Sequence, residues 1–275
     1  MIRLFFVIIC LFSSITSCSL SENYNDPETP LYSGDYRTDS VLIPDTLKLV
    51  SFNIKYSRRP REALNLLNSY SQLKDAHVIL LQEMQNKDVE TISRNLNCQY
   101  IYYPATFHIV AGHDFGNAIL SKFKLSDPEK IVLPHLNPVN KSIRIAVMGS
   151  AHVGSKRIRL VSLHLETPLM RSNNKQDQVQ AVLDEIQHQN QPIIIGGDFN
   201  TAFKNSARMI NSLMTRNGYT NVTRNSGYTM RGSLLPFFKF KLDHIYSKHV
   251  YIHDSGKVID FSASDHLPLW FTFSL

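Results

Sequence analysis

Residues 191–200 read QPIIIGGDFN, an apolar run that is followed by two glycines, an acid and an amide. Three consecutive isoleucines with no charge among them are typical of a strand buried on both faces. We expect Gly196 and Gly197 to end this strand, because glycine adopts backbone angles that other residues resist. Asp198 and Asn200 would then lie at the carboxyl end of the strand, where open α/β sheets place their chemistry. Alone, the stretch is weak evidence, since Asp and Asn also form simple turns there.

The composition is that of an ordinary globular protein. The chain has 275 residues, of which 43% are hydrophobic and 19% charged, enough for a substantial core. No internal linker or repeat divides it into two folded units. The net charge of +6 favours an anionic partner such as a phosphodiester or a membrane surface. Arg58, Arg59 and Arg61 form the densest basic cluster, for which a solvated loop is the default interpretation.

Residues 1–17 have the layout of an export signal. A positive charge precedes an apolar run (Leu4–Phe12), and small or polar residues follow. This run is too short to span a bilayer. The sequence ITSC at 15–18 resembles the lipobox of bacterial lipoproteins, in which the cysteine becomes the lipidated first residue. We predict a signal peptide over 1–17 and a lipid anchor at Cys18, which would hold the exported protein on a membrane of a bacterial cell envelope, such as the outer membrane. Ordinary signal cleavage is the alternative.

Residues 18–46 are rich in polar residues and proline and have no sustained apolar period, so we expect a flexible tether ahead of a folded domain over 47–275. With Cys10 in the signal and Cys18 as the anchor, Cys98 remains alone. No internal disulfide is then possible, and the domain must rely on its core. We expect it to be a monomer.

The hydrophobic periods predict more strands than helices. Helices are expected at 61–73, around 92–96, at 174–189 and at 205–217, and strands at 47–54, 77–81, 100–103, 117–123, 142–151, 157–165, 193–195, 241–247, 257–261 and 267–273. Many strands alternate between apolar and polar residues, while some helices directly follow strands. This mixture predicts two packed sheets flanked by helices, not one doubly wound sheet.

Seven short motifs occur in a fixed order along the chain. They are SFNIKY (51–56), LQE (81–83), GNAILS (116–121), SLHLE (162–166), GGDFN (196–200), LDHIY (242–246) and SDHLPL (264–269). Their order and approximate spacing resemble the endonuclease/exonuclease/phosphatase family, and the resemblance covers 47–275. Each motif is weak alone, but all of them in register are specific. The resemblance implies a four-layered α/β/β/α sandwich with its site at one edge of the two sheets.

The resemblance also implies a magnesium site. It assigns Glu83 as the principal Mg²⁺ ligand, with Asn53 and Asp265 helping to coordinate or position the metal; Mn²⁺ is an alternative ion. Mg²⁺ prefers oxygen ligands and keeps several waters, so one or two carboxylates and an amide suffice. Asn53 could instead form a turn at the end of its strand. A two-metal zinc or iron phosphoesterase also uses a Gly-Asp pair but needs further His and Asp blocks, such as a GNHE-like segment, which the sequence lacks.

The remaining residues of the motifs are catalytic by resemblance. His266 and Asp243 form a dyad, Asp198 and Asn200 orient the attacking water and the phosphate, and His164 is similar to the phosphate-contacting histidine of the deoxyribonuclease branch. Asp243 lies within an apolar strand, where an unpaired carboxylate is costly, so a partner is expected. Either Asp198 or His266 could take the proton from water.

The motifs do not fix the substrate, because members of the family share a core and differ in their loops. The loop at 228–241 is the most individual, and its apolar residues Leu234, Leu235, Phe237 and Phe238 could stack on bases, enter a membrane or cover the core. We expect core covering.

The leading hypothesis is a lipid-anchored, Mg²⁺-dependent phosphodiesterase, a nuclease with nucleic acid as its partner. The alternative is a phosphodiesterase or phosphatase acting on phospholipid or sphingolipid headgroups. A noncatalytic binding protein on the same scaffold is disfavoured, since the acids and histidines of the motifs are intact.

Overall fold

The structure is a computed structural model that describes residues 21–38, 43–109, 111–167, 170–232 and 237–275. The predicted signal peptide and Cys18 lie outside the described residues, as do Leu234 and Leu235. Within the described ranges, no helix combines the length and the apolar character needed to cross a membrane.

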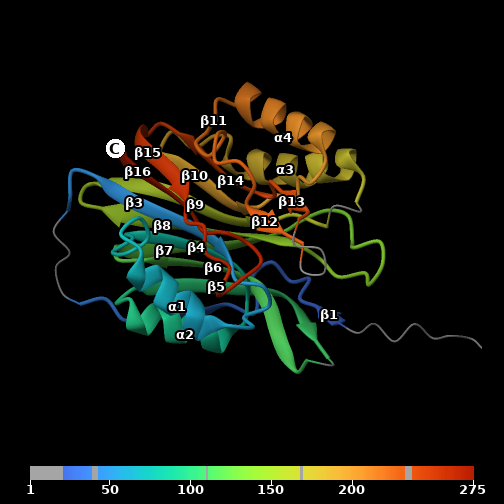
Figure 1. Cartoon of the computed structure of the whole chain (residues 1–275), viewed down its shortest axis with the longest axis horizontal. Coiled ribbons are helices and arrows are strands. Elements are labelled where there is room, and N and C mark those ends of the chain that lie inside the picture. The colour runs from blue at the N-terminus through green and yellow to red at the C-terminus, as the bar shows by residue number, and fades with distance from the viewer. Residues whose placement is uncertain (1–20, 39–42, 110, 168–169, 233–236) are drawn as a thin grey trace, which may run out of the picture.

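Two sheets stack face to face, and a pair of helices covers the outer face of each (Figure 1). The first sheet has the order β1-β5-β6-β4-β3-β16-β15, with β2 also paired to β5, and the second has the order β11-β14-β10-β9-β8-β7. Helices α1 (Pro60–Ser69) and α2 (Asn86–Asn95) pack on the first sheet, and α3 (Ser172–Ile186) and α4 (Lys204–Arg216) pack on the second. The predicted α/β/β/α sandwich is confirmed.

The strands have the following bounds. The first sheet contains β1 (Ser21–Asn23), β2 (Tyr32–Asp35), β3 (Leu47–Asn53), β4 (Val78–Met84), β5 (Gln99–His108), β6 (His113–Ser121), β15 (Tyr251–Lys257) and β16 (Leu269–Ser274). The second contains β7 (Lys124–Val132), β8 (Ile145–Val153), β9 (Lys156–His164), β10 (Ile193–Asp198), β11 (Thr220–Asn221) and β14 (Asp243–Lys248), while β12 (Met230–Arg231) and β13 (Lys239–Phe240) form a separate ribbon.

Alternation along the central strands divides the core into three layers. Leu49 of β3 and Ile194 of β10 belong to the cluster between the two sheets. Val50 packs towards α1 and α2, while Ile193 and Ile195 pack towards α3 and α4. Successive side chains of a strand point to opposite faces, so an uninterrupted apolar strand serves two layers at once.

Gly196 and Gly197 do not end their strand, contrary to our expectation, because β10 continues through both to Asp198. At Gly197 the backbone has φ +152°, and a Cβ would lie 1.8 Å from the carbonyl oxygen of Leu163 in β9. A Cβ at Gly196 would lie 2.8 Å from Leu80 of the facing sheet. The glycines therefore allow close approach within and between the sheets, and they carry Asp198 to the last position of the strand.

The polar segment expected as a tether is folded over much of its length. β1 pairs with β5 through Ser21 opposite His108, and β2 pairs with the other end of β5. Tyr32 packs against Tyr102, with ring centroids 6.0 Å apart. Polar composition suggested disorder, but these short strands satisfy the backbone groups along the outer edge of β5, which would otherwise be exposed.

Two further expectations on the C-terminal half differ from the structure. The strand expected at 257–261 lies earlier, as β15, so residues 258–268 form a longer loop before β16. Phe237 and Phe238 do not cover the core, since they are 72% and 49% exposed. They pack on each other instead, with ring centroids 5.0 Å apart.

Candidate active site

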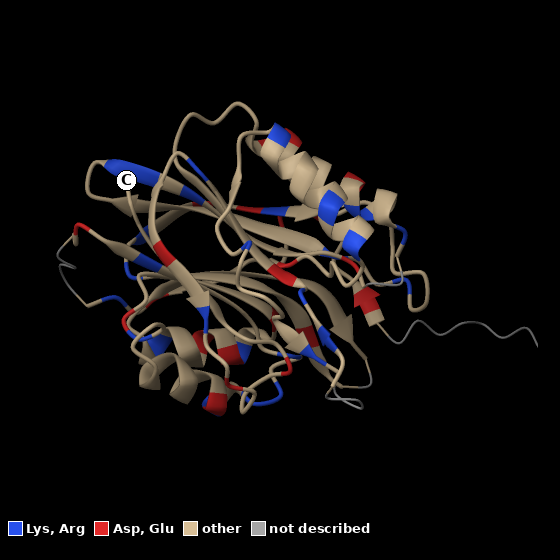
Figure 2. Ribbon diagram, turned by 45° about the horizontal axis from the view of Figure 1, so that its top comes forward, with Lys and Arg blue, Asp and Glu red and all other residues tan. Residues whose placement is uncertain are grey.

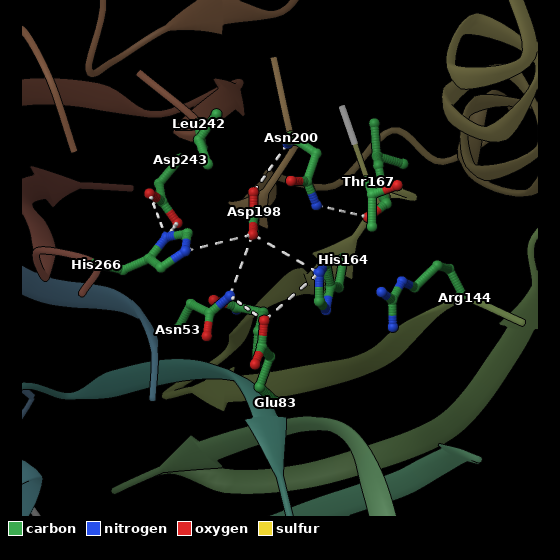
Figure 3. A network of polar contacts seen from close by, with 12 residues as sticks. Asn53, Glu83, Arg144, His164, Thr167, Asp198, Asn200, Leu242, Asp243 and His266 are labelled. Atoms are coloured by element: carbon green, nitrogen blue, oxygen red, sulfur yellow. Dashed lines mark hydrogen bonds and ion pairs between the residues drawn. The ribbon is translucent and has the colours of Figure 1, made fainter. Parts of the chain in front are cut away.

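Side chains from both sheets meet at one edge of the sandwich. Asn53 ends β3, Asp198 ends β10, His164 ends β9 and Asp243 begins β14, while Glu83 lies near the end of β4 and His266 lies in the loop before β16. β3 runs parallel to β4, and β9 runs parallel to β10, so their carboxyl ends emerge together. The acids, the amide and the histidines at these strand ends point towards one another (Figure 3).

His266 and Asp243 form the expected pair. The Nδ1 atom of His266 lies 2.9 and 3.1 Å from the two carboxylate oxygens of Asp243. Its Nε2 atom faces Asp198, 3.9 Å from Oδ2. Ser264 fixes the loop, because its hydroxyl donates to the carbonyl of Asn53 (2.7 Å) and accepts from the backbone N–H of His266 (3.1 Å). The imidazole thus lies between two carboxylates, hydrogen-bonded to Asp243 through Nδ1 and facing Asp198 with Nε2.

The electrostatics of this pair favour a charged histidine. Burial alone would lower the pKa of His266, but the adjacent carboxylates of Asp243 and Asp198 outweigh it and raise that pKa. Burial also raises the pKa of Asp198 above its usual range, and the negative charge of Asp243 adds to this increase, whereas His266 opposes it. A protonated imidazole beside Asp198 is the arrangement that these contacts stabilise.

A second convergent group could hold a metal ion. Ligand atoms of Glu83, His164 and Asp198 lie within 4.8 Å of one another. The amide nitrogen of Asn53 bridges the two acids, 3.0 Å from Glu83 Oε1 and 3.1 Å from Asp198 Oδ2. Two buried or nearly buried carboxylates beside an amide are a donor set that suits Mg²⁺ or Mn²⁺, since a hard cation would neutralise their mutual repulsion.

Backbone conformation at this group is strained. Glu83 and Asn200 have φ +60° and +51°, the left-handed region that side chains with a Cβ rarely adopt. The side chain of Glu83 accepts a hydrogen bond from the N–H of Tyr56 (3.1 Å), and the N–H of Asn200 donates to Asp198 Oδ1 (2.8 Å). Strain of this kind persists only where surrounding contacts fix the chain, and it clusters at functional sites.

His164 is buried at the back of the site. Its Nε2 atom lies 3.6 Å from Asp198 and 3.9 Å from Glu83, and Phe115 packs on its ring with centroids 5.7 Å apart. Burial and the nearby positive charge of Arg144 lower the pKa of His164 well below its ordinary value. A neutral imidazole here can donate to a phosphate oxygen or offer a nitrogen to the metal.

Asp265 is placed differently from the other predicted metal ligands. Among the described residues, neither convergent group of potential ligands includes it. Its Oδ2 atom lies 2.6 Å from the ammonium of Lys55, which follows Asn53 by two positions. Asp265 therefore adjoins the site through Lys55 and through its neighbour His266.

Arg144 and Lys175 are two buried cations of the site that the sequence motifs do not include. Arg144 lies 3.5 Å from Glu166 Oε1, and its guanidinium extends towards His164 (Figure 3). Lys175, on α3, donates to the carbonyl of Asn200 at 2.5 Å, and burial lowers its pKa to about 8. Both positions occur in segments whose pattern predicts ordinary surface charges, and only the folded topology turns them inward. His244, in contrast, points away from the site and contacts Thr201 (2.9 Å).

The geometry can be compared with known proteins. A model of the Endonuclease/Exonuclease/phosphatase family matches residues 50–266, which is most of the chain. The chain belongs to this family. The match over residues 50–266 confirms the resemblance that the seven motifs carry, and this endonuclease/exonuclease/phosphatase protein is a phosphoester hydrolase. No curated protein sequence matches it significantly.

Solved structures of the family share the fold. A family protein from Leptotrichia buccalis is 17% identical, with a TM-score of 0.66, and the match covers 83% of this chain and 100% of that one. Danio rerio TDP2, solved with a single-stranded DNA product, is 17% identical with a TM-score of 0.64, covering 84% and 100%. ANGEL2, a 2′,3′-cyclic phosphatase, is 16% identical with a TM-score of 0.65, covering 84% and 96%.

Proposed function

We propose that this protein is a divalent-metal-dependent phosphodiesterase that acts on nucleic acid. The observation that carries the proposal is the meeting of two groups at one strand edge. Glu83, Asn53 and His164 surround Asp198 on one side, and the His266–Asp243 pair faces it on the other. Such a site offers a place for a metal, a positioned water and a fixed cation around one phosphate.

The roles of the residues follow from their charges. When bound, Mg²⁺ or Mn²⁺ supplies charge neutralisation on the non-bridging oxygens of the phosphate. Asp198 orients the attacking water and takes its proton, because His266 is already protonated and cannot act as the base. As the P–O bond to the leaving oxygen breaks, His266 gives that oxygen a proton. Asp243 holds the imidazole in place, and Asn200 and His164 bracket the phosphate.

Support for nucleic acid as the substrate is electrostatic and comparative. The net charge of +6 suits a polyanion, and Figure 2 shows basic positions spread over both helical layers and the loops. The structure of TDP2 contains a single-stranded DNA product.

The test uses the full chain with single-stranded DNA, duplex DNA and RNA, in Mg²⁺ and in EDTA. We expect metal-dependent cleavage that Glu83→Gln reduces at least about 10²-fold, while Glu185→Gln, an exposed acid on α3, changes little. Full activity of Glu83→Gln, or full activity in EDTA, would refute the proposal.

We also propose export and lipid anchoring at Cys18. The signal layout of residues 1–17 supports this proposal, and the chain that the structure describes then begins close to the site. Ser21 pairs with His108 at the site edge, and Asn23 donates to the carbonyl of Lys141 (2.9 Å). Two residues lie between Cys18 and Ser21, so the three residue steps from one to the other span at most about 10 Å. Cys18→Ser should move the protein from the membrane fraction to the soluble one, and unchanged fractionation would refute the anchor.

A lipid headgroup phosphodiesterase is the second candidate function. Loops at the site edge expose Ile109 (55%) and Val139 (76%), and the aromatic pair Phe237 and Phe238 is exposed as well. Exposed apolar side chains beside a short membrane anchor favour contact with a bilayer. Metal-dependent hydrolysis of sphingomyelin or phosphatidylinositol vesicles, with nucleic acid left intact, would select this function over the first.

A further inference from the structure

A basic cavity adjoins the catalytic residues. Its volume is about 370 Å³, within the size range of small-ligand sites. The lining residues are Lys55, Arg58, Arg59, Arg231, Gly232, Phe261, Ala263, Ser264 and Asp265. Ser264 and Asp265 immediately precede His266, and Ser264 is bonded to Asn53 and His266 as described above. The cavity therefore adjoins the site through Ser264 and Asp265, and its lining includes neither the metal group nor the histidine pair.

Backbone pairing fixes Arg231 on one wall of the cavity. The N–H of Arg231 donates to the carbonyl of Asp265 (3.0 Å), and Met230 forms a bridge with His266. The guanidinium lies over the ring of Phe261, 4.0 Å from its centroid. A stacked guanidinium keeps its edge N–H groups available for a planar or tetrahedral oxyanion.

Three further lining residues, Lys55, Arg58 and Arg59, come from the loop between β3 and α1. Arg59 donates to the carbonyl of Ser262 (2.9 Å), which ties this loop to the segment before His266. Arg59 is also the N-cap residue of α1, and no side chain caps that end of the helix. The partial positive charge of a helix N-terminus thus adds to that of the arginines.

The cavity has an excess of positive charge. Of its ionisable residues, four are cationic and Asp265 alone is acidic, and Asp265 is bonded to Lys55. In the described part of the chain, no ion pair joins Arg58, Arg59 or Arg231 to an acidic residue. Three arginines converging on one hollow without a carboxylate partner predict an anionic ligand.

We propose that this cavity binds a second phosphate of the substrate, next to the phosphate that is cleaved. The inference rests on the proposed phosphodiesterase function and narrows it to substrates that carry at least two phosphates. In a nucleic acid strand the second group is the phosphate of a neighbouring nucleotide. In a lipid it would be a phosphate on the headgroup, as in a phosphorylated inositol.

The experiment compares substrates that differ only in the number of phosphates. For the full chain with Mg²⁺, kcat/KM is measured on the trinucleotide TpTpT and the dinucleotide TpT, and in a parallel arm on phosphatidylinositol 4-phosphate and phosphatidylinositol vesicles. We expect a preference of about tenfold or more for the substrate with two phosphates, since charge-assisted hydrogen bonds are the strong ones. A preference in the oligonucleotide arm identifies the second phosphate as that of a neighbouring nucleotide, and a preference in the vesicle arm identifies it as a headgroup phosphate.

Variants of the arginines then test whether the preference for two phosphates arises in the cavity. Arg58→Gln and Arg231→Gln should bring the ratio of the two kcat/KM values towards one. Arg61→Gln, which alters an exposed residue of α1 outside the cavity lining, should keep the wild-type ratio. A ratio that stays at the wild-type value in both cavity variants, or that Arg61→Gln lowers equally, would overturn the proposal.

A binding measurement tests the cavity even if the proposed phosphodiesterase activity is absent. If no substrate is hydrolysed, binding of thymidine 3′,5′-bisphosphate and thymidine 5′-monophosphate is measured by calorimetry. Tighter binding of the bisphosphate in the wild type, lost in Arg231→Gln, would support the cavity without the activity. Equal affinities for the two nucleotides would refute it.

Discussion

Asp198 and Asp243 lie directly opposite each other in the antiparallel pairing of β10 with β14, and His266 contacts both of them. His164 occupies the matching position on the other side of Asp198, in β9. Three adjacent strands thus deliver an acid, a second acid and a histidine to one row. Two buried carboxylates this close repel each other, so a cationic imidazole between them stabilises the row.

This relationship predicts that Asp243→Asn lowers kcat by about 10²- to 10⁴-fold, the usual contribution of a group acting in proton transfer. Asp243 acts through His266, so the pH profile must change too. The limb of the profile that reports protonation of His266 should move to lower pH, because the variant loses the negative charge of Asp243 that raises the pKa of His266. The control is Asp254→Asn, on exposed β15. An unchanged pH profile in Asp243→Asn would exclude this positioning role.

Metal binding should raise the stability of the folded chain. Mn²⁺ at about a hundred times its Kd should add about 2.7 kcal/mol to the free energy of unfolding, since the ion binds the assembled carboxylates and amide only in the folded state. Urea unfolding with and without Mn²⁺ measures this gain. Glu83→Gln should abolish it, whereas a gain retained in that variant would place the ion elsewhere.

Much of the fold could be predicted because the apolar periods are strong where the core is deepest. The strands expected at 193–195, 142–151 and 157–165 correspond to β10, β8 and β9. Asn53, His164 and Asp198 could be placed at the site because each ends such a strand, whereas Asp243 begins β14 and His266 lies in the loop before β16. The sequence does not show which strands are neighbours in the sheet. The row of His164, Asp198 and Asp243 depends on this strand order.

The remaining features depend on tertiary contacts. Ser21–Asn23 is polar and becomes a strand only because β5 offers it an edge. In the sequence, Gly197 resembles a residue that ends a strand. In the structure it must be glycine because a Cβ would collide with the carbonyl of Leu163. Arg144 carries no pattern of a buried residue, and its burial follows from pairing with Glu166.

The pairing of Arg144 with Glu166 predicts a large loss of stability in Arg144→Met. Glu166 is fully buried, so removing its cationic partner leaves a charge in the interior at a cost of about 3–5 kcal/mol. Urea unfolding measures the loss. The double variant Arg144→Met/Glu166→Leu should recover part of it, and a double variant no more stable than the single one would contradict this account.

Gly197→Ala should destabilise the protein far more than Gly112→Ala. Both glycines have positive φ, but a Cβ at Gly112 meets nothing within 4 Å, whereas at Gly197 it collides with backbone. We expect about 1 kcal/mol for Gly112→Ala from conformation alone and about 3 kcal/mol or more for Gly197→Ala. Because Asp198 is next in the chain, Gly197→Ala should also lower activity. Equal losses of unfolding free energy in the two variants would contradict the close approach of β10 and β9.

Buried neutral histidines predict that the protein loses stability in mild acid. Burial, and secondarily the charge of Lys241, lowers the pKa of His244 to about 3. The unfolded chain, with a histidine pKa of about 6.5, therefore takes up this proton first, so stability is full above that value and falls as the pH drops towards 3. Between about pH 7.5 and pH 5 this one residue should lower the free energy of unfolding by about 2 kcal/mol, from 1.4 kcal/mol per unit of pH.

His244→Gln, which can keep a hydrogen bond to Thr201, should remove this part of the acid-dependent loss, as measured by urea unfolding at the two pH values. His188→Gln, on the surface after α3, should not. An acid-dependent loss as large in His244→Gln as in the wild type would assign the proton uptake to other groups.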